Sequence, residues 1–117
     1  MNTSFLLLSV VIGFIPGIFS GLVPGIHTNT FSFILAACTP LLDELGFSPV
    51  CVAAIIISNA LTHTFLDIIP SVFLGAPDPD TSLAVLPGHQ MLLDGHGLEA
   101  IRLSALGSAG SVVVSLV

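Results

Sequence analysis

The chain has 117 residues, of which 54% are hydrophobic and only 7% are charged. Soluble domains carry about 25% charged residues, so this composition excludes an ordinary water-soluble domain of such a small size. The formal net charge is −6 and the only basic residue besides histidine is Arg102, which excludes a basic surface for nucleic acid. We therefore expect a multi-pass protein of the cell membrane whose surface is covered by the lipid bilayer.

The first apolar segment, residues 5–23, carries no charge. At about 1.5 Å per residue it spans about 28 Å, close to the thickness of the hydrocarbon core. No basic residue precedes it, as one would in a secretory signal peptide, so a retained membrane helix is expected. Gly13, Gly17 and Gly21 recur every fourth residue, which predicts a face that another helix can approach closely, and Pro16 predicts a kink.

A proline-glycine pair, Pro24 and Gly25, then interrupts the apolar sequence. A break at membrane depth is tolerated only where it lines a cavity or is buried in protein. The N-terminus of the helix that follows presents free N–H groups, which attract anions. We therefore predict that Pro24, Gly25, Thr28 and Asn29 bind a substrate anion, with Thr28, Asn29 or Thr30 able to cap the helix. The alternative is a loop that merely connects two helices at the membrane surface.

Three more apolar stretches, residues 29–42, 50–70 and 98–117, predict three further helices. Residues 71–97 are rich in proline and glycine and predict an irregular re-entrant and connector region. Because lipid tolerates only helices or closed barrels, and these apolar stretches are too long for barrel strands, the fold class is all-α with three to four transmembrane or re-entrant helices. The apolar end lacks a helix stop signal, so we expect the chain to be the N-terminal fragment of a longer transporter domain.

The third stretch contains four polar residues that lie within roughly 140° of one helical face: Asn59, Thr62, His63 and Asp67. Polar groups at membrane depth are costly and by default indicate a functional site. We predict that Asn59, Thr62 and His63 bind substrate and that Asp67 couples transport to a cation. The alternative is a polar seam whose hydrogen bonds are satisfied by neighbouring helices.

No metal site and no cofactor are expected apart from a coupling cation. His89, Asp94 and His96 lack the spacing of zinc ligands. Cys38 and Cys51 lie among apolar residues without CxxC spacing, and this favours buried, small hydrophobic side chains over a disulfide.

The sequence resembles the TctA-type large membrane subunits of tripartite tricarboxylate transporters. Residues 21–26 are similar to the early glycine and proline-glycine signature of that family, and residues 67–70 and 75–77 to a later isoleucine-proline turn and its continuation. Pro87 and His89 stand where the family has an aspartate and a tyrosine, so the chain resembles a divergent branch. The remaining matching positions are Pro40, Thr81, Leu86, Gly88, Met91, Gly95, Ala100 and Ser108.

This resemblance implies a helical, inverted-repeat permease subunit of a secondary transporter, and no enzymatic activity. It also implies a small carboxylate as substrate, Na⁺ or H⁺ as the coupling ion, and two protein partners, a small membrane subunit and a periplasmic binding protein. Two alternatives stay open at this point. One is an intramembrane enzyme that uses His63 and Asp67, and the other is a structural membrane subunit that transports nothing.

Overall fold

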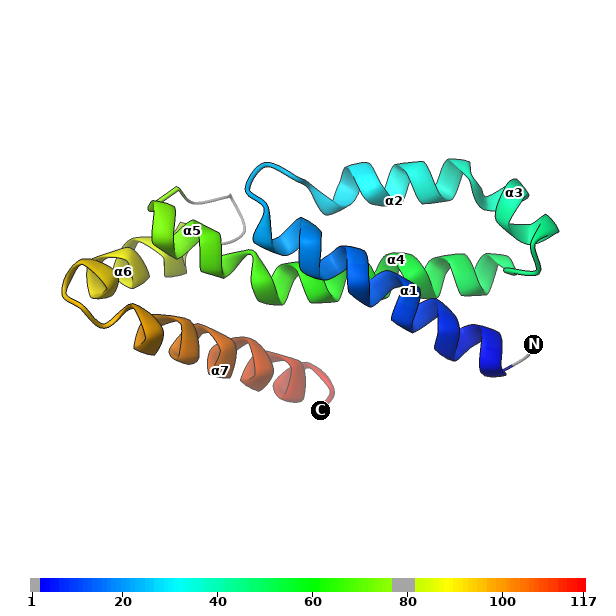
Figure 1. The fold of residues 1–117 in the computed structure, drawn as a ribbon. Coiled ribbons are helices and arrows are strands. Elements are labelled where there is room, and N and C mark those ends of the chain that lie inside the picture. Colours follow the sequence, from blue (N-terminus) through cyan, green and yellow to red (C-terminus); the bar gives the residue numbers. More distant parts are fainter. Residues whose placement is uncertain (1–2, 77–81) are drawn as a thin grey trace. The chain divides into compact units, whose positions relative to one another are not determined.

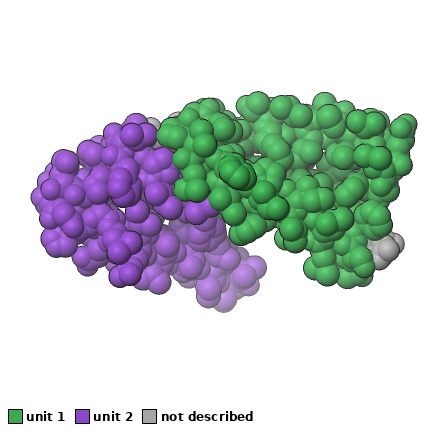
Figure 2. Space-filling model, viewed as in Figure 1, with its two compact units in different colours: residues 1–64 green, residues 65–117 purple. Residues whose placement is uncertain are grey.

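The computed structural model describes residues 3–76 and 82–117, which form helices joined by turns and contain no strand (Figure 1). In these residues three helical stretches are long and apolar enough to cross a membrane: Thr3–Leu22, Pro49–Leu74 and Gly97–Ser115. The predicted all-α, multi-pass membrane protein is therefore confirmed. The chain forms two compact units, residues 1–64 and 65–117 (Figure 2).

In the first unit, helix α1 (Thr3–Leu22) packs against helix α4 (Pro49–Leu66) through very small side chains. A Cβ atom on Gly13 would overlap the carbonyl oxygen of Ile55, and one on Gly17 would lie 2.6 Å from Cβ of Thr62. The two backbones thus touch, as the glycine spacing predicts. The buried residues of α1 are all small: Ser9, Gly13, Gly17, Ser20 and Gly21.

The predicted helix over residues 29–42 is divided in two, and this is a correction. Helix α2 (Thr28–Ala37) ends before Cys38, and the short helix α3 (Thr39–Glu44) follows. Pro40 occupies the first turn of α3, where its missing N–H is tolerated but cannot continue the hydrogen bonds of α2. The turn after α3 lies against the start of α1, where the rings of Phe47 and Phe5 meet edge to face at 5.6 Å.

The second unit contains α5 (Ile68–Leu74), α6 (Ser82–Leu93) and α7 (Gly97–Ser115). These helices meet at Gly88, whose hypothetical Cβ would lie 3.0 Å from a methyl group of Val72 and 3.9 Å from Cβ of Ala100. The absence of a side chain at Gly88 therefore lets three helices converge. The buried apolar cluster of this unit consists of Ile68, Val72, Val85 and Ala100.

The expected irregular region over residues 71–97 also needs correction, since α5 and α6 make most of it helical. Pro87 lies inside α6 and removes one hydrogen bond, to the second residue of the helix. Val85 in the same helix is completely buried in the apolar cluster, and this packing stabilises α6. Of the residues between the two helices, 77–81 lie outside the part of the chain that the structure describes.

Candidate functional site

The predicted break at Pro24 and Gly25 is present as an exposed turn between α1 and α2. Gly25 has a φ of +87°, a left-handed backbone conformation that residues other than glycine rarely adopt. A Cβ atom on Gly25 would have no heavy atom within 4 Å, so the backbone here is open to an approaching ligand. Since no neighbour crowds this position, glycine is needed here for its backbone conformation and not for lack of space.

The start of α2 differs from the expected cap. The N-cap residue is His27, which makes no capping hydrogen bond with its side chain, and Thr28 is already the first helical residue. The backbone N–H of Thr30 bonds to the carbonyl of His27, and Thr28 and Asn29 occupy the first turn as half-buried and exposed residues. The positive end of the α2 dipole therefore has no side-chain cap from His27, an arrangement that can hold an anion.

On α4, two of the predicted substrate residues are engaged with α1. The Nδ1 atom of His63 lies 3.1 Å from Oγ of Ser20, and the Ser20 hydroxyl is also 3.3 Å from the carbonyl oxygen of Gly17. Thr62 packs on Gly17, while its hydroxyl donates to the carbonyl of Ser58 at 2.8 Å. His63 therefore contacts α1 through a polar group, whereas Thr62 packs on α1 and keeps its hydroxyl bond within α4. The substrate role of both residues stays a prediction.

The third residue, Asn59, behaves differently. Its side chain is completely buried, and its backbone carbonyl lies 2.9 Å from where Gly17 would carry a Cβ atom. Within the described part of the chain, neither Nδ2 nor Oδ1 of Asn59 has a hydrogen-bond partner. A buried amide without partners is unfavourable by about 1–3 kcal/mol. Such a group in a membrane helix calls for a functional explanation.

Asp67, the predicted cation-coupling residue, lies between α4 and α5 in the second unit. It is half-buried, and its backbone carbonyl accepts the N–H of Ser71 at 3.2 Å. Its carboxylate makes no capping hydrogen bond to α5. The role of Asp67 in ion coupling stays a prediction.

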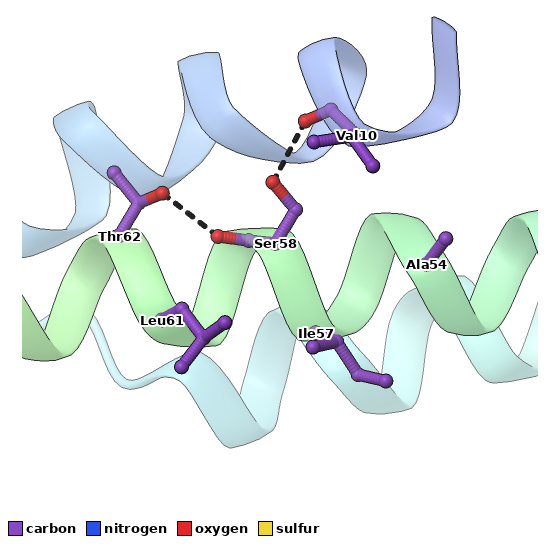
Figure 3. Close-up of a pocket in the computed structure, with 6 residues that line it drawn as sticks. All are labelled: Val10, Ala54, Ile57, Ser58, Leu61 and Thr62. Carbon is purple, nitrogen blue, oxygen red and sulfur yellow. Dashed lines mark hydrogen bonds between the residues drawn. The ribbon is translucent and has the colours of Figure 1, made fainter. Parts of the chain in front are cut away.

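An apolar groove of about 370 Å³ lies in the first unit, between α1 and α4 (Figure 3). The hydroxyl of Ser58 in its wall donates to the carbonyl of Val10 at 2.7 Å, so its proton is not available to a carboxylate oxygen. The groove therefore does not suit a carboxylate, and Thr62 is the only predicted substrate residue in it. Its lining consists of Val10, Ala54, Ile57, Ser58, Leu61 and Thr62.

The predicted convergence of the α1–α2 turn with the polar face of α4 stays a prediction. The described contacts of Asn59 and Thr62 are with α1 and α4, and the space around Gly25 is open. Sequence reasoning also missed Ser9, Ser20 and Ser58, which take part in the α1–α4 contact. Their spacing from the glycines, three or four residues, was the signal that could have found the two serines of α1.

Comparison with known proteins decides the family. A family model described as the tripartite tricarboxylate transporter TctA family matches residues 7–117. The chain belongs to this family. It is 38% identical over 110 residues to an uncharacterized protein of Methanocaldococcus jannaschii, an alignment that covers 94% of this chain and 26% of that protein. The chain thus spans about a quarter of the length of this relative.

No solved structure matches the chain. The family match confirms the resemblance seen in residues 21–26 and 67–77, and it agrees with the apolar helices in making the chain part of a multi-pass membrane protein. Because the family is one of transporters, the alternative of an intramembrane enzyme is not favoured.

Proposed function

We propose that this chain forms part of the permease subunit of a secondary transporter for small carboxylates, driven by a gradient of Na⁺ or H⁺. The observation that carries the proposal is the family match over residues 7–117. The proposal includes the partners that the resemblance implies, a small membrane subunit and a periplasmic binding protein, and it gives Asp67 the task of ion coupling.

The uncapped start of α2 supports the substrate class. The single arginine, Arg102, is exposed on α7, and the first unit contains neither lysine nor arginine. A carboxylate bound by the first unit must therefore be held by backbone N–H groups, hydroxyls, amides and the imidazoles of His27 and His63. Thr28 and Asn29 supply such groups in the first turn of α2, and Gly25 keeps the approach to them open.

A test compares two glycines of equal conformation. Gly25 has φ +87° and Gly95 has φ +85°, and a Cβ atom at either position would meet no heavy atom within 4 Å. Valine should strain both turns by similar amounts, roughly 1–3 kcal/mol. Only at Gly25 does it also obstruct the proposed anion site. Uptake of radiolabelled citrate by membrane vesicles that contain the full-length protein should fall at least tenfold in Gly25→Val, and much less in Gly95→Val.

Expression and membrane insertion of both variants are measured by immunoblotting of the vesicles. Equal uptake by the two variants at equal protein levels would contradict a substrate role for the α1–α2 turn. If the unmodified protein and its partner subunits take up no carboxylate under any ion gradient, the proposed function itself is wrong.

A further inference from the structure

We propose that α1 and α4 separate during the transport cycle, and that the Asn59 amide, occluded in this structure, is then exposed and binds a carboxylate oxygen. The inference rests on the proposed function and adds to it the moving contact and the group that the motion uncovers. It is carried by the complete burial of Asn59 together with the lack of a partner for its amide among the described residues.

The Asn59 amide is unfavourable where it is buried. Its Nδ2 is a donor and its Oδ1 an acceptor, and burying both unpaired disfavours the arrangement in which they are buried. An apolar side chain at position 59 would avoid that cost, as Ile55 does one turn earlier with 2% exposure. The amide is best explained by a second arrangement in which water or a ligand reaches it. Its N–H₂ group would then donate to a carboxylate oxygen.

Polar contacts between α1 and α4 oppose their separation. Two hydrogen bonds join the helices on either side of Asn59, from Ser58 Oγ to the Val10 carbonyl at 2.7 Å and between His63 Nδ1 and Ser20 Oγ at 3.1 Å. Hydrogen bonds between membrane helices contribute little each, because the separated helices find other partners. The free-energy cost of burying the unpaired Asn59 amide is comparable to the contribution of these two hydrogen bonds and opposes it. Closed and open arrangements that lie close in free energy are what a ligand needs in order to shift their populations.

The surface of α1 that contacts α4 is bare at two positions. Gly13 and Gly17 present bare backbone to α4, so no side chain of α1 at these two positions has to change rotamer when the helices part. Pro16 lies between these glycines and has no N–H to donate to the carbonyl of Ile12. Proline is a common cause of bending in helices. The face of α1 that touches α4 is therefore also the place where α1 bends most easily.

The chain contains its own reporter of this motion. Cys51 on α4 is 2% exposed, and its thiol lies beside the hydroxyls of Ser9 on α1 and Ser48. Separation of the helices would expose this thiol to water, where a maleimide reacts with the thiolate. Cys38, in the turn between α2 and α3, is half-buried and serves as an internal reference.

The experiment measures the rate at which N-ethylmaleimide labels each cysteine in membrane vesicles that contain the full-length protein, by mass spectrometry of chymotryptic peptides. In Asn59→Leu the closed arrangement loses its unpaired amide, so Cys51 should be labelled about tenfold more slowly while Cys38 is labelled at the unmodified rate. In Ser58→Ala the bond to Val10 is lost, and Cys51 should be labelled about threefold faster.

Unchanged or faster labelling of Cys51 in Asn59→Leu, with Cys38 unchanged, would overturn the proposal. So would a Cys51 that stays unlabelled in the unmodified protein after Cys38 has reacted completely. If Asn59→Leu disturbs the fold, both cysteines react faster, and Ser9→Cys then decides. A disulfide between positions 9 and 51 should abolish citrate uptake until it is reduced. Uptake that persists with the disulfide formed would overturn the proposal.

The labelling result does not depend on transport. A protein that shows the Asn59 effect on Cys51 but takes up no carboxylate would retain the opening of α1 and α4 and disprove the proposed function and the role of Asn59 as a carboxylate-binding group. A protein that transports carboxylates but shows no effect of Asn59→Leu on Cys51 would retain the proposed function and disprove the opening of α1 and α4.

Discussion

Helices are brought together through glycine in both units of the chain, yet the glycines face different neighbours. In the first unit, Gly13 of α1 faces the backbone carbonyl of Ile55, and polar side chains flank the contact. In the second unit, Gly88 of α6 faces a methyl group of Val72 and Cβ of Ala100, within an apolar cluster. The contact at Gly13 is backbone against backbone, whereas the contact at Gly88 is backbone against side chain.

The difference matters because a side chain can move and a helix backbone cannot without shifting the whole helix. A contact between backbones therefore has few intermediate positions and is either made or broken. A contact with side chains adapts to small changes by changing rotamers. The first unit thus contains the contact that suits a two-state motion, and the second contains a small stable core.

The largest expected effect comes from adding one methyl group to Gly13, and the same change at Gly88 provides the comparison. Gly13→Ala places a carbon on the carbonyl oxygen of Ile55 and should lower the free energy of unfolding by about 2–3 kcal/mol. Gly88→Ala needs only a small movement of Val72, 3.0 Å away, and gains helix propensity, so its effect should stay below about 1 kcal/mol. Unfolding by SDS in mixed micelles, followed by circular dichroism, measures both values.

Gly107 provides a control for the substitution itself, because a Cβ atom there would meet no heavy atom within 4 Å. Gly107→Ala should be neutral or slightly stabilising. If Gly13→Ala and Gly88→Ala were equally destabilising, the distinction between the two kinds of contact would be lost.

A smaller effect is expected at His89, which supplies the polar contact of the second unit. Its Nδ1 lies 2.7 Å from the carbonyl oxygen of Val72, and since a carbonyl only accepts, Nδ1 carries a proton and donates it. His89→Leu should remove this bond between α6 and α5 at a cost of about 1 kcal/mol in the same unfolding measurement. His96 is exposed, and although it is the N-cap residue of α7 its side chain makes no capping hydrogen bond, so His96→Leu is the matched control and should leave stability unchanged. A neutral His89→Leu would show that apolar packing alone holds the second unit together.

The smallest effect is expected at Ser58. Ser58→Ala removes its hydrogen bond to Val10, and bonds of this kind between membrane helices contribute about 0.6 kcal/mol on average. Ser111→Ala is the control, since Ser111 is exposed and its hydroxyl donates to the carbonyl of Ser108 in its own helix. The two variants are compared in the same SDS titration. A cost above about 2 kcal/mol at Ser58 would mean that the α1–α4 contact is too strong to open readily.

Much of the first unit could be predicted from sequence. The repeat of Gly13, Gly17 and Gly21 predicted the close approach of a helix, because without side chains there is nothing else to keep backbones apart. The pair Pro24 and Gly25 predicted the break after α1. The family resemblance in residues 21–26 and 67–77 was also visible, and the match over residues 7–117 confirms it.

The helix boundaries were predicted less well where proline was involved. Pro40 ends one helix and begins another, whereas Pro87 lies within α6. Proline removes one N–H in both cases, and whether the helix continues depends on packing that the local sequence does not contain.

The sequence by itself determined that this protein lies in a membrane, that it is helical, and that α1 has a bare face, because composition and periodicity express those properties directly. Only the tertiary structure decided which helix covers that face and what becomes of the polar residues opposite it. It shows that Thr62 and His63 are engaged in the α1–α4 contact, while Asn59 beside them is buried and has no partner among the described residues. Helical periodicity places all three on one face, but the free energy of a polar group depends on the atoms that meet it.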